Sequence, residues 1–255
     1  MAGDPTPMDG DPPTCDPVAG DTVAGALAVI IPVLDGAAHL GATLAAIAPA
    51  RASGLIGQVI VVDGGSRDDS VALALAEGAQ VLHSPPGRGR QLRLGAACAT
   101  APWLLFLHAD SRPDPGWAAV LRDFCAANPP GSGGRARAAA FRLRFDDAGL
   151  AARIVAAGAN WRARYLALPY GDQGLLIPRA LYDAVGGYRD MALMEDVDIA
   201  RRLGRRRIRL LDHPITTSAE RYRRAGYARR VLRNLSILAL HAFGVGPDRL
   251  ARLYR

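Results

Sequence analysis

The amino-acid sequence predicts an α/β fold in which a mostly parallel sheet carries helices on both faces. Short runs that are apolar on both strand faces alternate with helix-like stretches between residues 26 and 110. The chain has 255 residues and half of them are hydrophobic, which is enough to bury a large core. Ligands of such sheets bind at the carboxyl ends of the strands, so binding and catalytic residues are expected there.

The expected elements follow one another at regular spacing. They are a strand at 26–34, a helix at 37–48, a strand at 58–63, a helix at 68–78, a strand at 79–83, a helix at 90–99 and a strand at 103–110. They are followed by a half-exposed strand at 138–145, helices at 150–167 and 194–203, and a polar turn at 170–174.

Composition divides the chain into three regions. Residues 1–25 hold five Asp and little to bury, and are expected to form a disordered tail rich in Pro and Gly. Residues 26–215 are expected to form the α/β domain, and residues 216–255 a basic amphipathic helical extension. From residue 201 onward there are 15 Arg and 3 acidic residues, so the net charge of +7 belongs to the C-terminal quarter.

Several function classes are excluded or disfavoured. All 31 basic residues are Arg, which removes the phosphate-binding P-loop and Schiff-base chemistry, since both need Lys. The first strand leads into LDGAAHLG and not the G-x-G-x-x-G of dinucleotide-binding enzymes. No signal peptide or membrane span is expected. The odd number of cysteines, Cys15, Cys98 and Cys125, favours a reducing compartment, and we predict a cytoplasmic protein.

Asp63 stands at the end of the second strand, in VVDGGSRDDS. It lies before two glycines and too early to cap the next helix, whereas the neighbouring acids suit helix capping. A carboxylate at a strand tip beside a glycine turn suits hydrogen bonding to a base or a ribose. We therefore favour a binding role for Asp63.

The segment GRGRQLR places Arg88, Arg90 and Arg93 at an expected helix N-terminus. The helix dipole disfavours cations there, so an anion such as a diphosphate is a natural partner. A solvated arginine face is the alternative explanation, and this pattern by itself does not exclude it.

Asp110 ends the fourth strand, in FLHADSRPDPGW, where it can hold a hard divalent cation against a diphosphate. His108 shares its strand face and is either a second ligand or a packed core histidine. Glu195, Asp196 and Asp198 open the helix of MEDVDIARRL. Either one of them is a general base, or all three only complement the helix dipole.

Over residues 27–222 the chain resembles the inverting family 2 glycosyltransferases with a GT-A fold. The resemblance rests on an ordered set of motifs: VIIPVLDG, VVDGGSRDDS, GRGRQ, LHAD, GDQG, GGY and MEDVDIARRL. The segments GRGRQ, LHAD, GDQG and TTSAERY are most similar to a small bacterial branch associated with arsenosugar and selenium-related gene neighbourhoods.

This resemblance implies roles for individual residues. On the donor side the implied contacts are Pro32 with the base, Asp63 with the nucleoside, and Arg88, Arg90 and Gln91 near the nucleotide. Asp110 would ligate Mn²⁺ or Mg²⁺ as the last residue of the family's D-x-D motif. In the Glu195–Asp196 pair, Asp196 would be the base that deprotonates the acceptor. Asp172, Gln173 and the retained Arg221 would shape the sugar or acceptor pocket.

The chain departs from the family pattern at three places. His108 replaces the first Asp of D-x-D, although His-Ala-Asp is usual for the branch. Asp35-Gly36 stands where the family has Asn-Glu, and Glu220 and Tyr222 stand where Arg and Trp are commoner. His108 and His213 are both open as further metal ligands.

The expected reaction is direct displacement at the anomeric carbon of a UDP- or GDP-sugar, with Asp196 accepting the proton of a small-molecule or lipid acceptor. One alternative is a sugar transferase acting on polyprenyl phosphate at the membrane surface. Another is an inactive nucleotide-sugar-binding protein, which the retention of Asp110 and Asp196 disfavours. A nucleotidyltransferase would need a Gly-rich N-terminal loop and usually a Lys, and both are missing.

Residues 224–243 are expected to form one amphipathic helix with Tyr227, Val231, Leu235 and Leu238 on its apolar face. That face either docks on the catalytic domain or lies on anionic lipid as a peripheral membrane contact. Nucleic acid is disfavoured, because the positive charge accompanies a wide apolar face without an aromatic platform.

Overall fold

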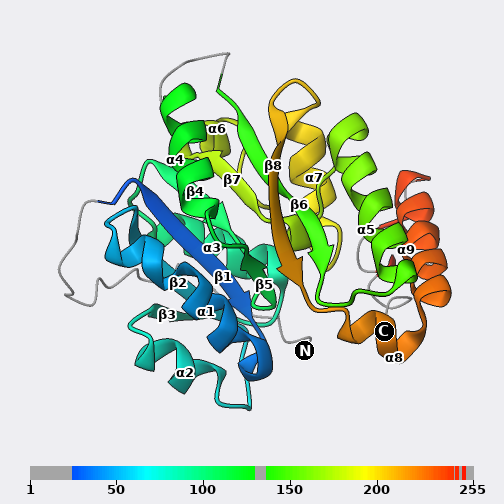
Figure 1. Cartoon of the computed structure of the whole chain (residues 1–255), viewed down its shortest axis with the longest axis horizontal. Helices are drawn as coiled ribbons and strands as arrows, with labels where there is room; N and C mark the ends of the chain where they lie inside the picture. The colour runs from blue at the N-terminus through cyan, green and yellow to red at the C-terminus, as the bar shows by residue number, and fades with distance from the viewer. Residues whose placement is uncertain (1–24, 130–135, 244, 247–248, 251–255) are drawn as a thin grey trace, which may run out of the picture.

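The computed structural model describes residues 25–129, 136–243, 245–246 and 249–250. One curled eight-stranded sheet forms its centre, with helices on both faces (Figure 1). The strands lie side by side in the order β3-β2-β1-β4-β7-β6-β8-β5. The predicted α/β class is therefore confirmed.

The bounds of the elements are as follows. The strands are β1 Leu27–Val33, β2 Ile56–Asp63, β3 Gln80–His83, β4 Trp103–Phe106, β5 Ser111–Pro113, β6 Ala138–Phe145, β7 Leu175–Pro178 and β8 Ile208–Thr217. The α-helices are α1 Ala37–Ala52, α2 Ser70–Ala76, α3 Arg88–Cys98, α4 Trp117–Ala127, α5 Leu150–Trp161, α6 Arg179–Ala184, α7 Glu195–Leu203, α8 Glu220–Ala225 and α9 Tyr227–Ala242. A π-helical turn, η2 Arg162–Leu166, and a 3₁₀ turn, η3 Gly171–Gln173, complete the set.

The two halves of the sheet differ in strand direction. β1 pairs in parallel with β2 and β4, and β2 pairs in parallel with β3. In the other half β7 is antiparallel to β4 and β6, β5 is antiparallel to β8, and β6 and β8 are parallel. The carboxyl ends of β1, β2 and β4 therefore meet at one edge of the sheet, near the change from parallel to antiparallel pairing. Ligands of α/β folds bind at such an edge.

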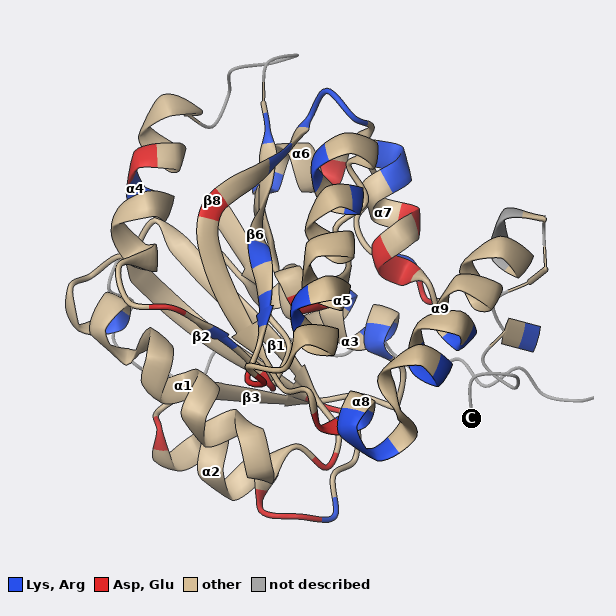
Figure 2. Ribbon diagram, turned by 45° about the vertical axis from the view of Figure 1, so that its right-hand side comes forward, with Lys and Arg blue, Asp and Glu red and all other residues tan. Residues whose placement is uncertain are grey.

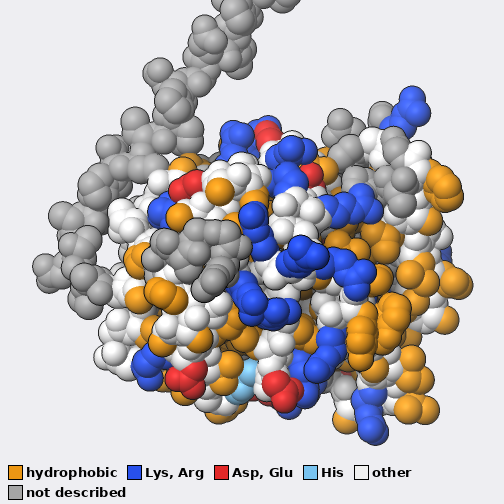
Figure 3. All heavy atoms as spheres, turned by 90° about the horizontal axis from the view of Figure 1, so that it is seen from above, with side chains coloured by type: hydrophobic (Ala, Val, Ile, Leu, Met, Phe, Trp, Pro, Cys, Tyr) orange, Lys and Arg blue, Asp and Glu red, His pale blue; other side chains and the backbone are white. Residues whose placement is uncertain are grey.

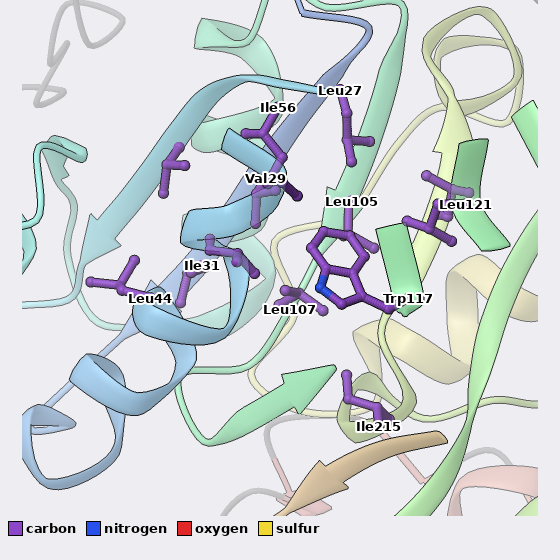
Figure 4. Close-up of a cluster of buried hydrophobic side chains, with 14 of the residues drawn as sticks. Leu27, Val29, Ile31, Leu44, Ile56, Leu105, Leu107, Trp117, Leu121 and Ile215 are labelled. Carbon is purple, nitrogen blue, oxygen red and sulfur yellow. The ribbon is translucent and has the colours of Figure 1, made fainter. Parts of the chain in front are cut away.

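The central strand β1 is buried at all seven positions because helices cover both of its faces. On one face Val29, Ile31 and Leu105 pack against Trp117 of α4 (Figure 4). On the other face α3 lies close to the sheet at Gly95, where an added Cβ would come within 2.5 Å of Ile30 Cγ2. Helices α4 and α3 thus pack closely on the two faces of the sheet.

Several boundaries differ from expectation. The fourth strand ends at Phe106, four residues before Asp110, because the chain turns there to reach β5. The expected helix at 150–167 becomes α5 followed by the π turn η2. β8 continues to Thr217, beyond the domain boundary we placed at 215.

Residues 220–242 form two helices and not one, because Gly226 adopts a left-handed φ of 80° between α8 and α9. The predicted apolar face is partly wrong. Leu235 is 56% exposed, whereas Ile237, which we had not placed on it, is 3% exposed and packs inward. Arg230 and Arg233 are half-buried, although we expected both to lie off the packed face.

Two further expectations concern the location of the protein. Within the part of the chain that the structure describes, no helix has the length and apolar character needed to span a bilayer. Cys125 is a free cysteine, and the reducing compartment inferred from the cysteines stays a prediction. The cytoplasmic location stays a prediction, as does the disordered tail at 1–25, of which only Gly25 is among the described residues.

Candidate active site

An ion-pair cluster joins the start of α3 to the start of α7. The Nε of Arg88 donates to the nearly buried Glu195 carboxylate, and its Nη2 lies 3.4 Å from Asp196 Oδ2. Burial by itself would lower the pKa of Arg88, but the charges of Glu195 and Asp196 outweigh it and raise the pKa. The arginine predicted to meet an anion therefore meets two carboxylates of the protein.

Asp196 is held in one orientation by three donors. Its Oδ2 accepts the backbone N–H of Gly171 at 2.9 Å as well as Arg88, and its Oδ1 accepts the N–H of Val197 at 2.8 Å. Gly171 is needed there, because a Cβ at this position would lie 2.3 Å from His108 Nε2. The first glycine of GDQG thus lets the loop approach both Asp196 and His108.

His108 and Asp110 lie together after β4, with His108 Nδ1 and Asp110 Oδ1 3.9 Å apart. Burial, aided by the charges of Arg88 and Arg221, holds the pKa of His108 well below its usual value, so the imidazole is neutral. His108 Nε2 is enclosed and has no hydrogen-bond partner among the described residues. Asp110 remains 25% exposed and open to the solvent side.

Asp172 is repelled by the charges of both Asp110 and Asp196. Its Oδ1 is enclosed and without a hydrogen-bond partner among the described residues. Burial raises the pKa of Asp172 to about 6, against the attraction of Arg162 and with repulsion from Asp196 and Asp110. The charges of Asp110, Asp172 and Asp196 therefore act on one another. Figure 2 shows the acidic residues at the start of α7, to which Asp196 belongs.

Asp63 ends β2 as expected, yet it is only 3% exposed. Its carboxylate accepts the N–H of Gly65 at 3.0 Å and that of Ser66 at 3.0 Å. Burial would raise the pKa of Asp63, but these hydrogen bonds and contacts with Ser66 and His83 lower it. Asp63 therefore shapes the glycine turn from which any nucleoside contact would be made.

The loops after β1 and β2 are joined at this edge. Asp35, in a left-handed conformation with φ of 50°, accepts the N–H of Arg67 at 2.8 Å, and Asp68 accepts the N–H of Ala37 at 2.9 Å. The position where the chain departs from the family pattern is thus used to tie two loops together, and Asp68 satisfies a free donor at the start of α1.

Comparisons with known proteins show which proteins the chain is similar to. Residues 28–142 match the model of glycosyl transferase family 2. Three uncharacterized glycosyltransferases, one from Mycobacterium bovis and two from strains of Mycobacterium tuberculosis, are each 39% identical over 100 residues. The match covers 39% of this chain and 41% of each relative, so it spans less than half of the relatives' length.

Solved structures share the fold. Glucosyl-3-phosphoglycerate synthase from Mycobacterium tuberculosis, in complex with Mn²⁺, UDP and glucosyl-3-phosphoglycerate, superposes with a TM-score of 0.54 at 21% identity, over 84% of this chain and 80% of that chain. The same enzyme with Mn²⁺ and UDP-glucose gives a TM-score of 0.52 at 22% identity, over 76% of this chain and 71% of that chain. The predicted GT-A type of fold is therefore confirmed.

Other predicted site residues have structural partners. Gln91 is buried, and its Nε2 donates to the carbonyls of Val33 at 2.8 Å and Val62 at 2.7 Å, which fastens α3 to the ends of β1 and β2. Gln173 is fully buried, and its Nε2 donates to the Phe141 carbonyl at 3.1 Å. Both amide side chains hold the backbone around the site in place. Their direct contacts with a ligand stay predictions.

The remaining predicted residues lie at different distances from the cluster. Arg90 forms an ion pair with Asp190, 2.7 Å from Nη2, at the surface. Pro32 is buried within β1. Arg221 of α8 is exposed, but it is near enough to lower the pKa of His108. His213 Nε2 donates to the Asp114 carbonyl at 2.9 Å, which gives that histidine a structural partner.

Tyr188 is the site residue that the sequence reasoning missed. It lines the same pocket as Arg88, His108, Glu195 and Asp196, and burial raises its pKa well above the usual value. The motif GGY is the signal by which Tyr188 could have been found. Gly187 of this motif has a left-handed φ of 58° and turns the chain just before Tyr188. Its phenol is thus a neutral wall of the pocket.

The donor chemistry fits a divalent cation held jointly with a substrate. Among the described residues no group of three or more His, Cys, Asp or Glu side chains is placed to hold a metal. Mg²⁺ and similar ions are commonly held by one or two carboxylates together with substrate phosphates and water. Asp110 is such a carboxylate, and the neutral His108 beside it is in the form that binds metals.

Proposed function

We propose that this protein is an inverting, metal-dependent glycosyltransferase that uses a nucleoside-diphosphate sugar. The observation that carries the proposal is the neighbourhood of Asp110 and Asp196, joined through Asp172, at the strand ends of a GT-A fold. Asp110, which follows β4, and Asp196, in the first turn of α7, come together there although they are far apart in the sequence. The family match over residues 28–142 supports the same class of reaction.

The donor is expected at the edge formed by β1 and β2. Pro32 and the turn held by Asp63 would border the base and ribose, and Arg88 and Arg90 would lie near the diphosphate. A Mn²⁺ or Mg²⁺ ion at Asp110 would offset the negative charge that develops on the leaving diphosphate. The solved neighbours that contain Mn²⁺ with UDP or UDP-glucose support this assignment.

Asp196 is the proposed general base. The acceptor oxygen attacks the anomeric carbon, the bond from that carbon to the diphosphate oxygen breaks, and the acceptor proton passes to Asp196. The hydrogen bonds from Gly171, Val197 and Arg88 hold the carboxylate in place and leave lone pairs for the acceptor hydroxyl. Glu195 anchors Arg88 in this arrangement.

The acceptor side of the pocket is assigned to Asp172 and Arg221, with Gln173 holding the loop from below. The enclosed Oδ1 of Asp172 lacks a protein partner among the described residues, so a sugar or acceptor hydroxyl could donate to it.

A second candidate is transfer to a lipid phosphate, which the exposed apolar residues of α5 and α9 favour. A phosphate acceptor is already ionised near neutral pH and needs no general base. Substitution of Asp196 would then lower turnover only slightly, which separates this candidate from transfer to a hydroxyl.

A screen of UDP- and GDP-sugars, each with and without Mn²⁺ or Mg²⁺, tests the proposal. We expect at least one nucleotide sugar to raise the melting temperature only with metal, and to be hydrolysed slowly to the nucleoside diphosphate and free sugar. Binding without any turnover would favour an inactive binding protein. No stabilisation by any nucleotide sugar would contradict the proposal.

A further inference from the structure

Helix α5 turns an apolar face toward solvent. Its inner residues, such as Ala152 and Ala156, pack onto β6. Its outer residues Leu150, Ile154 and Trp161 are 71%, 62% and 57% exposed and follow helical spacing. Tyr165 in η2 continues this stripe and contacts Trp161, with ring centroids 5.7 Å apart.

Helix α9 does the same beside it. Ile237 is buried against the domain, while Leu232 and Leu235 are 65% and 56% exposed on the opposite side. The stripe ends at Leu240 and at Phe243, which is 87% exposed. α9 is therefore apolar on two sides, and the domain covers only one of them.

The two exposed stripes belong to one surface. α5 and α9 pack beside each other, and the Tyr227 hydroxyl donates to Asp147 Oδ2 at 2.7 Å just before α5. Figure 3 shows apolar side chains gathered on this side of the molecule with arginines next to them. We call these residues the α5–α9 surface: Leu150, Ile154, Trp161, Tyr165, Leu166, Leu232, Leu235, Leu240 and Phe243.

The charged residues within the two segments that carry this surface have one sign. Residues 150–166 and 227–243 contain six Arg and neither Asp nor Glu. Of these, Arg153, Arg164 and Arg229 are exposed. Helices with exposed apolar, tryptophan and tyrosine side chains and with arginine as their only charged residue have the composition of helices that lie in the headgroup region of anionic bilayers.

We propose that the α5–α9 surface binds the surface of an anionic lipid bilayer. A second copy of the chain is a poorer occupant, because a two-fold interface would bring the arginines of one copy against those of the other. An anionic bilayer complements both the charge and the apolar area. The arginines then meet headgroup phosphates while the leucines and aromatic rings enter the acyl boundary.

This orientation relates the bilayer to the candidate active site. α5 leads through η2 to Gly171 and Asp172, and α8, which precedes α9, carries Arg221 near His108. If the proposed function holds, the bilayer would lie next to the acceptor side of the pocket. The binding itself does not depend on that function and is measured without any sugar donor.

Flotation of the full-length chain tests the proposal, with vesicles of phosphatidylcholine alone or containing about one third phosphatidylglycerol. We expect flotation with the anionic vesicles only, decreasing as salt rises. Ile154→Gln/Trp161→Gln on α5 and Leu232→Gln/Leu235→Gln on α9 should each weaken binding about tenfold or more. Arg153→Glu/Arg229→Glu should weaken it at least about fivefold per arginine.

Matched controls lie on other faces. The control variants are Leu75→Gln on α2, where Leu75 is 58% exposed, and Arg122→Glu on α4, where Arg122 is exposed. Both control variants should float like the wild type. Because every substituted residue is exposed, melting curves should show folded protein. The proposal is overturned if the wild type never floats, or if the α5 and α9 variants float as well as the controls. A dimer in light scattering that Leu232→Gln/Leu235→Gln dissociates, without lipid binding, would assign the surface to a second copy.

Discussion

Asp196 has the geometry of a fixed base, and its replacement should affect chemistry more than donor binding. Asp196→Asn keeps the shape but cannot take the acceptor proton, so we expect kcat to fall ~10²–10⁴-fold with donor affinity nearly unchanged. Steady-state kinetics together with donor titration measure both. Asp198→Asn is the control on the same helix. Asp198 pairs with Arg189 and Arg202, and its loss should lower stability while turnover is kept.

Asp110 should matter for the metal-bound nucleotide. Asp110→Asn is expected to weaken nucleoside-diphosphate binding in Mn²⁺ by ~1–3 kcal/mol, as for a lost charged contact. In EDTA the variant and the wild type should bind equally weakly. Calorimetric titration gives both values, and Asp114→Asn, which breaks an ion pair with Arg144, serves as the control. Wild-type affinity that is insensitive to EDTA would count against a metal at Asp110.

Asp172 should make stability depend on pH in a defined direction. Its pKa is raised from 3.8 to about 6 by burial, so the folded protein holds this proton more tightly than the unfolded chain does. Stability should therefore fall as pH rises from about 4 to about 6 and then level off. Asp172→Asn removes this effect and should be more stable than wild type by ~1–3 kcal/mol above that range, with no difference below it. Urea unfolding in EDTA at several pH values measures the difference, and equal stability of both proteins at every pH would contradict it.

At the scale of residues, the positions of the acids could be read from the sequence more easily than the contacts of the amides. Asp110 and Asp196 could be found because a carboxylate at a strand end or a helix start is visible in the pattern. Gln91 and Gln173 looked like ligand contacts, but they donate to backbone carbonyls that approach them only after folding. The ion pair between Arg88 and Glu195 could not be predicted from the sequence either, since the two residues are 107 positions apart.

At the scale of elements, α3 should tolerate no side chain at Gly89. A Cβ there would lie 2.2 Å from the Arg189 carbonyl oxygen, in the loop that leads to α7. Gly89→Ala should therefore cost ~1–3 kcal/mol of stability and displace Arg88 from Glu195. Gly158→Ala in α5, where nothing lies within 4 Å, should instead gain ~0.5–1 kcal/mol. Denaturant unfolding measures the stability of the two variants. Similar changes in both would show that the loop at Arg189 moves to accept the added Cβ, against this prediction.

The sequence predicted the order and type of the elements in the parallel half well, because strands buried on both faces stand out as continuous apolar runs. It failed where two explanations fit one pattern. The expected strand at 103–110 was extended past Phe106 because apolar residues continue there, although the chain turns at that point. In α9 both sides are apolar, so the pattern alone could not tell which side packs on the domain, and the exposed Leu235 was placed inward.

At the scale of the whole molecule, function depends on two halves of the sheet meeting. The parallel half supplies the β1–β2 edge and Asp110, while the mixed half supplies Asp172 and, through α7, Asp196. The described helices of the basic C-terminal quarter, α8 and α9, adjoin the second half, on the proposed acceptor side. Its charge asymmetry was readable from composition, whereas its packing beside α5 was not, because that contact joins distant segments.

The central claim is inverting transfer from a nucleotide sugar at this site. The most direct measurement is NMR of the slow hydrolysis of a UDP- or GDP-sugar with an α-anomeric linkage, followed in real time. The account predicts the nucleoside diphosphate and the β-anomer of the free sugar as first products, only with Mn²⁺ or Mg²⁺ and not with Asp196→Asn. First appearance of the α-anomer, or cleavage to a sugar phosphate and a nucleoside monophosphate, would contradict it.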